Sequence, residues 1–139
     1  MAQPVKIDPI VKISKTDDEW RKQLTAEQYQ VLRHEATEPP FKNPLHDNKK
    51  AGLYQCAGCE LPLFSSDHKF DSGTGWPSFW KPIAPEVIAT RTDFKLIFPR
   101  TEVHCARCEG HQGHVFKDGP PPTGLRYCIN SAALKFVPS

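Results

Sequence analysis

The chain has 139 residues, a formal net charge of +2 and a mean hydropathy of −0.53. This length suits one domain, and no apolar run approaches the roughly 18 residues that a membrane helix needs. Lysines and arginines are spread along the chain, which argues against dedicated nucleic-acid binding, and the segment Met1–Trp20 lacks a signal-peptide pattern. We therefore expect a cytoplasmic protein that binds neither membrane nor nucleic acid.

The N-terminal part predicts a flexible tail over residues 1–15, followed by a single domain over residues 16–139. Two capping boxes, each a threonine followed three residues later by Glu or Gln, predict two short helices. They begin at Thr16 and at Thr25, with Glu19 and Gln28 as the partners. Apolar residues at helical spacing extend the second helix through Ala36, and Pro39-Pro40 closes it.

From Gly52 onward the apolar residues alternate over short stretches, which is typical of β-strands. Fourteen prolines, about twice the usual frequency of roughly 5%, also indicate many turns and short elements. The predicted strands are Leu53–Gln55, Val87–Thr90, Phe94–Phe98, Glu102–His104, His114–Phe116, Leu125–Ile129 and Leu134–Val137. We expect a mainly β fold: a small antiparallel β domain of two sheets with a short helical N-terminal arm.

Four of the five cysteines form two C-x-x-C pairs, Cys56 with Cys59 and Cys105 with Cys108. Two residues between thiolates let one tight turn direct both sulfurs at one ion, and four sulfurs complete a closed tetrahedral zinc site. Disulfides, a redox C-x-x-C or ordinary core cysteines are alternatives, but two pairs in a chain without an export signal favour zinc. A closed site of four cysteines has no open position, so we expect one structural Zn2+ per chain.

The fifth cysteine, Cys128, lies in the segment Arg126-Tyr127-Cys128-Ile129-Asn130-Ser131. A lone cysteine is often only a small core residue. Because side chains alternate along a strand, Arg126, Cys128 and Asn130 share one face here. A guanidinium beside a thiol favours the reactive thiolate, and Asn130 could hold a reaction oxygen or orient a substrate. This polar face makes Cys128 the candidate nucleophile.

A pair of histidines, His111 and His114, provides candidate acids. Histidine titrates near neutrality and can deliver a proton to an oxygen leaving group. We expect Gly113 to permit a sharp bend that turns both rings inward, and Asp118 to orient one imidazole or act on a water. Surface histidines, or a metal site formed with Cys128, are the alternatives.

The segment from Gly73 to Trp80 carries Trp76, Phe79 and Trp80 around Pro77. These aromatic residues could belong to the core. The glycines on both sides of Thr74 nevertheless favour an exposed loop that presents Trp76, whose flat ring suits a small apolar group such as a methyl bonded to sulfur.

Together these segments resemble the B-type methionine sulfoxide reductases. The resemblance runs from about Asp17 to Val137. It rests on both C-x-x-C pairs and on the segments Ser72-Gly73-Thr74-Gly75-Trp76-Pro77-Ser78-Phe79, His111 to Gly119 and Arg126 to Ser131. It implies a peptide-methionine (R)-S-oxide reductase that repairs oxidised proteins under oxidative stress.

The resemblance also assigns roles. It implies that Cys128 attacks the sulfoxide sulfur and becomes a sulfenic acid, which thioredoxin or another thiol reductant then restores. His111 and His114 would position and protonate the sulfoxide oxygen, with Asp118, Arg126 and Asn130 in support and Trp76 as the wall for the substrate's methyl group. Nothing in the sequence demands more than a monomer.

Two positions depart from the family. Many relatives carry a resolving cysteine where this chain has Thr74, so the sulfenic acid must be reduced from outside the chain. Gln112 replaces a commoner leucine, which we expect to alter packing more than chemistry. Two rival functions are a zinc-ribbon module that binds RNA or protein and a Cys-His thiol hydrolase. The first leaves the polar face around Cys128 unexplained, and no feature indicates the acyl substrate of the second.

Overall fold

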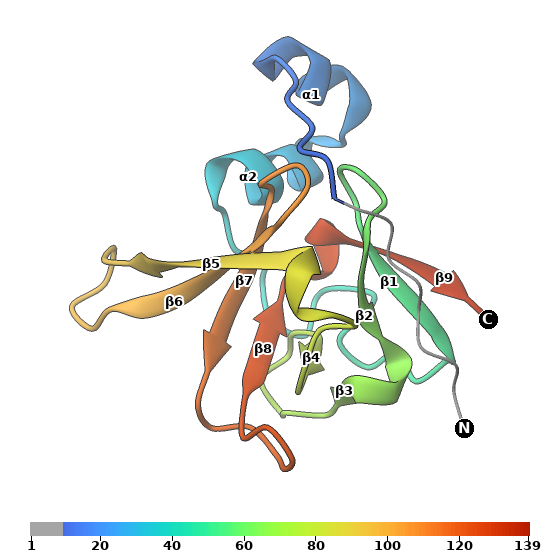
Figure 1. Cartoon of the computed structure of the whole chain (residues 1–139), viewed down its shortest axis with the longest axis vertical. Coiled ribbons are helices and arrows are strands. Elements are labelled where there is room, and N and C mark those ends of the chain that lie inside the picture. The colour runs from blue at the N-terminus through green and yellow to red at the C-terminus, as the bar shows by residue number, and fades with distance from the viewer. Residues whose placement is uncertain (1–9) are drawn as a thin grey trace.

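The computed structural model describes residues 10–139, and two antiparallel sheets make up most of it (Figure 1). The mainly β fold with a helical arm is therefore confirmed. The smaller sheet has the order β2-β1-β9, and its strands are β1 (Gly52–Cys56), β2 (Pro62–Ser65) and β9 (Leu134–Pro138). The larger sheet has the order β3-β4-β8-β7-β6-β5, with strands β3 (Lys69–Phe70), β4 (Ser78–Phe79), β5 (Ile88–Asp93), β6 (Arg100–Cys105), β7 (His111–Phe116) and β8 (Arg126–Ile129). Most of the tail predicted over residues 1–15 lies outside the described residues.

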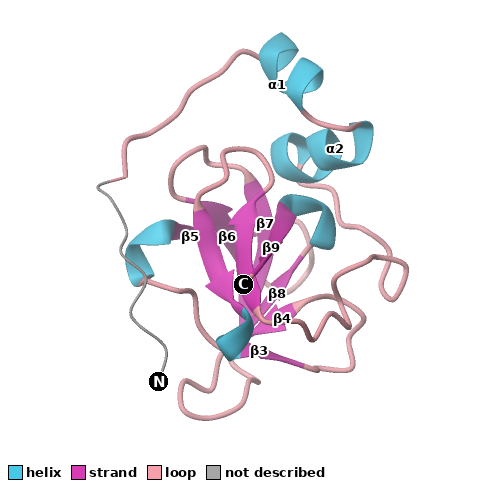
Figure 2. Cartoon of the chain, turned by 90° about the vertical axis from the view of Figure 1, so that its right-hand side faces the viewer, coloured by secondary structure: helices cyan, strands magenta, loops and turns pink. Residues whose placement is uncertain are grey.

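Both predicted helices form at one end of the β domain, α1 (Asp17–Gln23) and α2 (Ala26–His34) (Figures 1 and 2). Both capping boxes are present, with the Thr16 and Thr25 side chains accepting from the backbone N–H three residues on. The second helix is shorter than predicted. It stops at His34 because Glu35 adopts a left-handed conformation (φ 59°), so Ala36 lies beyond its end.

Aromatic side chains from both sheets form the core between them. Phe64 of β2 stacks on Phe79 of β4 with ring centroids 4.4 Å apart, and Tyr54 of β1 meets Phe79 edge-on at 5.0 Å. All three side chains are fully buried. Apolar burial of this kind is the main favourable term in folding. The core covers one face of the larger sheet, so polar side chains can occupy the other face. Short 3-10 turns at Ser66–His68, Pro85–Val87 and Ser131–Ala133 connect the strands.

One predicted strand is wrong. Phe94–Phe98 is an exposed loop, because β5 and β6 pair directly as a hairpin from Asp93↔Arg100 onward and leave the intervening residues as its turn. The Asp93 carboxylate accepts the Lys95 N–H at 2.9 Å, which caps the strand's end. The strand expected from Val87 begins one residue later, since Val87 closes a 3-10 turn. The short strands β2, β3 and β4 were not predicted.

An irregular register between β6 and β7 determines which side chains share a face. Val103 pairs with Gly113, but the next residue, His104, pairs with His111, so that Gln112 has no partner on β6. This extra residue is a β-bulge. Residues three apart normally lie on opposite faces of a strand. The bulge instead places His111 and His114 on the same face.

The other pairings extend this polar face across the sheet. Opposed residues in an antiparallel pair project to the same side, and Glu102 pairs with His114, which in turn pairs with Cys128. Arg91 and Asp93 of β5 lie on the same face through their pairing with Glu102 and Arg100. One side of the larger sheet is thus lined with titratable groups.

Gly113 does not form the bend that we expected, because it lies within β7 opposite Ile129. A β-carbon there would lie 2.0 Å from the Cys128 carbonyl oxygen, so the position requires glycine for the close approach of β8. The bulge, and not a glycine bend, brings the two histidines to one face.

Within residues 10–139, the structure has no helix long and apolar enough to cross a membrane.

Candidate active site and metal centre

A cavity of about 220 Å³ opens on the polar face of the larger sheet and exposes the thiol of Cys128. It brings together five of the predicted site residues: Trp76, His114, Arg126, Cys128 and Asn130. Phe116 and Ile129 add apolar surface, while Thr37, Thr74 and Arg100 add polar groups. His111 and Asp118 do not line it. A small cavity with an apolar wall and a few convergent polar groups is typical of a small-molecule site.

Burial dominates the electrostatics of Cys128 and raises the pKa of its thiol above the ordinary value. The positive charge of Arg126 and the neighbouring Thr74 hydroxyl act in the opposite direction. Arg126 thus favours the thiolate, as its place on the same strand face predicts, but burial outweighs it. At neutral pH the resting group is the protonated thiol, which holds both a nucleophilic sulfur and a proton.

His114 is buried beside Cys128 and is held by a carboxylate from the neighbouring hairpin. Its Nε2 lies 2.9 Å from Oδ2 of Asp93, the last residue of β5. The hydrogen bond from His114 is the main cause that holds the pKa of Asp93 well below its usual range. Arg100 also contacts Oδ2, at 3.2 Å. Asp93 thereby fixes the orientation of the imidazole, leaving Nδ1 as the nitrogen available to a ligand.

His111 lies behind His114, with the two ring centroids 5.6 Å apart. Its Nδ1 lies 2.7 Å from Oε1 of the Glu102 carboxylate. Burial lowers the pKa of His111 to about 4, and the nearby Glu102 carboxylate only partly offsets that effect. His111 is therefore a neutral ring that packs against His114.

Asp118 binds Arg126 and neither imidazole. The guanidinium donates from Nε to Oδ1 at 2.9 Å and from Nη2 to Oδ2 at 3.2 Å. Arg126 also lies over the Phe116 ring, 4.4 Å from its centroid. This bidentate pair lowers the pKa of Asp118, and it fixes the guanidinium beside the thiol.

Glu38, in the connection after α2, joins two walls of the cavity. Its carbonyl oxygen accepts from Nε1 of Trp76 at 2.9 Å, and its backbone N–H donates to Oδ1 of Asn130 at 3.1 Å. Its buried carboxylate accepts the N–H groups of Ser131 and Ala132. Burial raises the pKa of Glu38, although these two hydrogen bonds oppose the shift. One residue therefore sets the spacing between the indole and the amide.

Sequence reasoning missed the two carboxylates that hold the histidines, Asp93 and Glu102, and it missed Glu38. No motif marks them, because each comes from a strand or loop whose partner is known only once the register is known. The available signal was that Asp93 directly precedes the predicted strand Phe94–Phe98 and that Glu102 begins the predicted strand Glu102–His104.

The four C-x-x-C sulfurs converge at the junction of the two sheets. The ligand atoms of Cys56, Cys59, Cys105 and Cys108 all lie within 4.8 Å of one another. Two of the separations are 3.6 Å, between Cys56 and Cys108, and 3.5 Å, between Cys59 and Cys105. Zinc–sulfur bonds of about 2.3 Å in a tetrahedron require sulfurs about 3.8 Å apart. The cluster fits a metal ion and is consistent with zinc.

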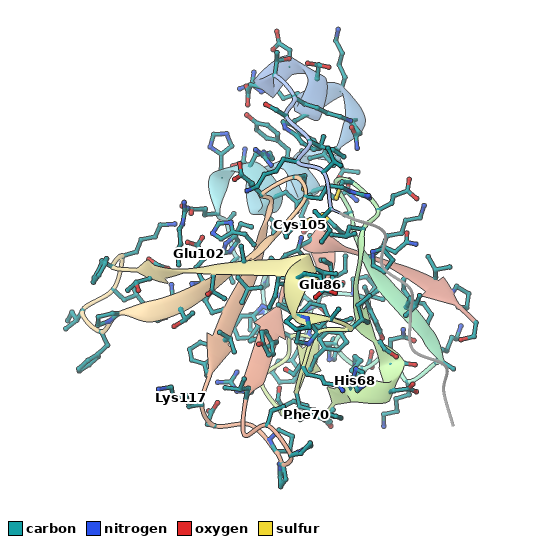
Figure 3. The ribbon with its side chains drawn as sticks, viewed as in Figure 1. His68, Phe70, Glu86, Glu102, Cys105 and Lys117 are labelled. Atoms are coloured by element: carbon teal, nitrogen blue, oxygen red, sulfur yellow. The ribbon has the colours of Figure 1, made fainter. Side chains whose placement is uncertain are left out.

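The two cysteine pairs occupy equivalent turns. In each, the first cysteine's carbonyl accepts from the backbone N–H of a glutamate four residues on, Glu60 or Glu109, at 2.8 and 2.9 Å. Both glutamates have a positive φ, of 63° and 64°. The sequence signal for this duplication is the repeat of Cys-Ala-x-Cys-Glu. Cys105 is the last residue of β6 and lies beneath the helices (Figure 3). Glu102 lies on the same strand, nearer to the loop that joins β5 to β6.

Gln112 connects the two sites. The residue that the bulge leaves unpaired is fully buried, and its Nε2 lies 3.4 Å from the Cys56 sulfur. Its carbonyl oxygen accepts both N–H groups of Asn130, from the backbone at 2.9 Å and from the side chain at 3.1 Å. Gln112 therefore donates a hydrogen bond to a sulfur of the cysteine cluster, in addition to the altered packing that we expected.

A second group of potential ligands adjoins a larger cavity of about 410 Å³: Glu35, Glu102, His104 and His111. Its carboxylates already have cationic partners. Glu35 binds Arg91 at 2.6 Å and Lys95 at 2.5 Å, and Arg91 also binds Glu102 at 3.0 Å. Lys95 is the main cause that lowers the pKa of Glu35 to about 2. The charges balance, so we interpret this group as an ion-pair network.

Stability should fall in acid because of His111. Its pKa of about 4 lies below the roughly 6.5 of an unfolded histidine, so the unfolded chain binds more protons between these values. The stabilisation that comes from keeping His111 neutral is fully present above pH 6.5 and is lost as the pH falls toward 4. The free energy of unfolding should decrease by about 3 kcal/mol over this range. Urea unfolding across this range should show a smaller loss in His111→Asn than in the native chain. Equal losses would contradict the assignment.

The cysteine cluster should hold about one metal ion per chain, and zinc is the ion that four thiolates favour. Removing it with a chelator should markedly lower the melting temperature, since structural zinc sites contribute on the order of 10 kcal/mol. Metal analysis of purified protein, with Cys59→Ser as the ligand variant and Cys128→Ser as the control that keeps the metal, checks this. Metal-free native protein would overturn it.

Comparison with known proteins places the chain in a family. The SelR domain family matches residues 24–138. The chain is 53% identical over 127 residues to the peptide methionine sulfoxide reductase MsrB of Agrobacterium fabrum, covering 91% of this chain and 94% of that protein. It is 56% identical to the MsrB of Pseudomonas putida, covering 91% and 96%, and 53% identical to the MsrB of Methanosarcina barkeri, covering 89% and 87%. The chain therefore belongs to the SelR domain family, the family of the MsrB reductases.

Proposed function

We propose that the chain is a peptide-methionine (R)-S-oxide reductase that returns oxidised methionine in proteins to methionine, with Cys128 as the nucleophile. The observation that carries this proposal is a cysteine thiol that lines a small cavity with an aromatic wall and a carboxylate-held imidazole beside it. Burial raises the pKa of this thiol. Membership in the MsrB family supports the same reaction.

Cys128 performs the redox step. Its sulfur attacks the sulfoxide sulfur, the S–O bond of the substrate breaks, and the oxygen becomes bonded to the cysteine sulfur with the thiol's proton. The products are methionine and a cysteine sulfenic acid, so the substrate sulfur gains the two electrons that Cys128 loses. The raised pKa of Cys128 suits this step, because the oxygen needs a proton.

The surrounding residues bind the two ends of the sulfoxide. Trp76 holds the methyl group against its ring, and His114 with its Asp93-bound imidazole faces the oxygen and donates or transfers the proton there. Asn130 orients the substrate from the opposite wall. His111, packed behind His114, and Asp118, bound to Arg126, act as positioning residues.

A thiol reductant from outside the chain closes the cycle. Two thiols donate two electrons to the sulfenic acid, which yields Cys128, water and the reductant's disulfide. Thioredoxin, or a small thiol, has this chemistry. The reaction needs a compartment that keeps thiols reduced, as the cytoplasm does. The chain acts as a monomer, and its one structural Zn2+ ties the two sheets together without taking part in the reaction.

Activity assays test the proposal. With dithiothreitol, the purified protein should reduce the R but not the S sulfoxide of N-acetylmethionine. Cys128→Ser should lose turnover by at least about a thousandfold, because nothing else supplies the nucleophile. Mass spectrometry after a single turnover should show one added oxygen on Cys128. Retained activity in Cys128→Ser, with zinc and melting temperature unchanged, would defeat the mechanism.

Thr74 and Cys128 line the same cavity, so a thiol at position 74 would lie close to a sulfenic acid on Cys128. We expect Thr74→Cys to form a disulfide with Cys128 after one turnover, detected as the loss of the added oxygen and of two hydrogens. Thr74→Ser, which keeps the hydroxyl, is the matched control and should retain the sulfenic acid. A persistent sulfenic acid in Thr74→Cys would mean that the two side chains do not meet.

A further inference from the structure

The loop between β5 and β6 is the most apolar exposed surface of the described chain. Phe94, Leu96, Ile97 and Phe98 are 75%, 58%, 94% and 80% exposed. Only three other large apolar side chains within residues 10–139 are exposed, and they are spread over different segments. The hairpin that carries the loop projects from the body of the molecule (Figure 1). A continuous apolar patch of this kind marks an interaction site.

Both ends of the loop adjoin residues of the active site. Asp93, the residue before it, holds the imidazole of His114, and Arg100, the residue after it, lines the cavity of Cys128. Arg100 and Asp93 are joined at 3.2 Å, which closes the base of the loop. Lys95 fastens the loop to Glu35 beyond the end of α2 at 2.5 Å. The apolar side chains are therefore displayed from an anchored backbone at the rim of the cavity.

Another exposed apolar side chain, outside the loop, lies near the opposite wall. Phe41 is 61% exposed, and its backbone N–H donates to the Gly75 carbonyl oxygen at 2.8 Å, next to Trp76. When the oxidised side chain of a polypeptide enters the cavity, the residues next to it in that polypeptide must lie over the edges of the cavity. The loop 94–99 and Phe41 lie at these edges.

We infer that the loop 94–99 binds the apolar residues that flank methionine sulfoxide in a substrate protein, so that the enzyme prefers sulfoxides in apolar segments. The inference rests on the proposed function. Methionine is mostly a buried, apolar residue that packs among other apolar residues in protein cores. Oxidation makes the side chain polar and disrupts the packing around it, which exposes those neighbours. An anchored apolar loop at the cavity's rim complements them and costs little ordering on binding.

Kinetics on matched peptides test this inference. One peptide carries methionine-R-sulfoxide between leucine and phenylalanine residues, and the other carries it between serine and glycine residues. The variant Phe94→Ser/Ile97→Ser/Phe98→Ser should lower kcat/KM for the apolar peptide about tenfold, mainly through KM. For the polar peptide and for N-acetylmethionine sulfoxide, the kcat/KM of the variant should stay within about twofold of the native value. Val11→Ser removes an equally exposed apolar side chain elsewhere and should change neither.

The outcomes separate the two proposals. If the native chain reduces none of the substrates, the proposed function fails. If it reduces all of them and the loop variant affects the two peptides equally, the loop does not bind the substrate. A defect confined to turnover with thioredoxin, with dithiothreitol rates unchanged, would assign the loop to the reductant. Dissociation of a native dimer by the variant would assign it to a second copy of the chain. Either result would overturn the inference.

Discussion

The active face of this protein depends on one β-bulge. Without the extra residue at Gln112, the strict alternation of β7 would place His111 and His114 on opposite faces of the sheet, and only one could approach Cys128. With it, both rings lie on one face, and the carboxylates of Asp93 and Glu102, paired in register on the neighbouring strands, reach one ring each. The same bulge turns the Gln112 amide toward Cys56 on the other side.

The cysteine cluster lies at the end of a strand that takes part in this register, outside the cavity of Cys128. One cysteine pair follows β1 in the smaller sheet, and the other follows β6, next to the bulge. A metal ion held by both pairs would fix the end of β6 against the smaller sheet, a few residues from His104 and Glu102. The cysteine cluster lies apart from the cavity, yet β6 carries the carboxylate that contacts His111. A metal ion in this cluster would therefore act on the site through the position of a strand.

The parts of this architecture that depend on local sequence could be predicted. Capping boxes involve residues three apart, and C-x-x-C turns bring their own sulfurs together, so the sequence alone is enough to identify both. The common face of Arg126, Cys128 and Asn130 follows from strand periodicity alone. The bulge and the two histidine-binding carboxylates depend on pairing between strands, which no single strand reveals. The apolar alternation of Phe94 to Phe98 is the same in an exposed loop as in a half-buried strand, and only the pairing of Asp93 with Arg100 identifies these residues as the turn of a hairpin.

Burial of Cys128 could seem to work against catalysis, since a raised pKa leaves less thiolate. In the proposed reaction the thiol's proton is also needed, because the oxygen that leaves the substrate sulfur must acquire a proton as it is transferred. A thiol that keeps its proton until the sulfoxide is bound supplies that proton at the reaction centre, and Arg126 limits how far burial suppresses its ionisation. A resting thiol is also less readily oxidised than a thiolate in the absence of substrate. The apolar wall of Trp76 and Phe116 and the charge of Arg126 thus set opposing limits on one pKa, and the cavity's mixed composition follows from that requirement.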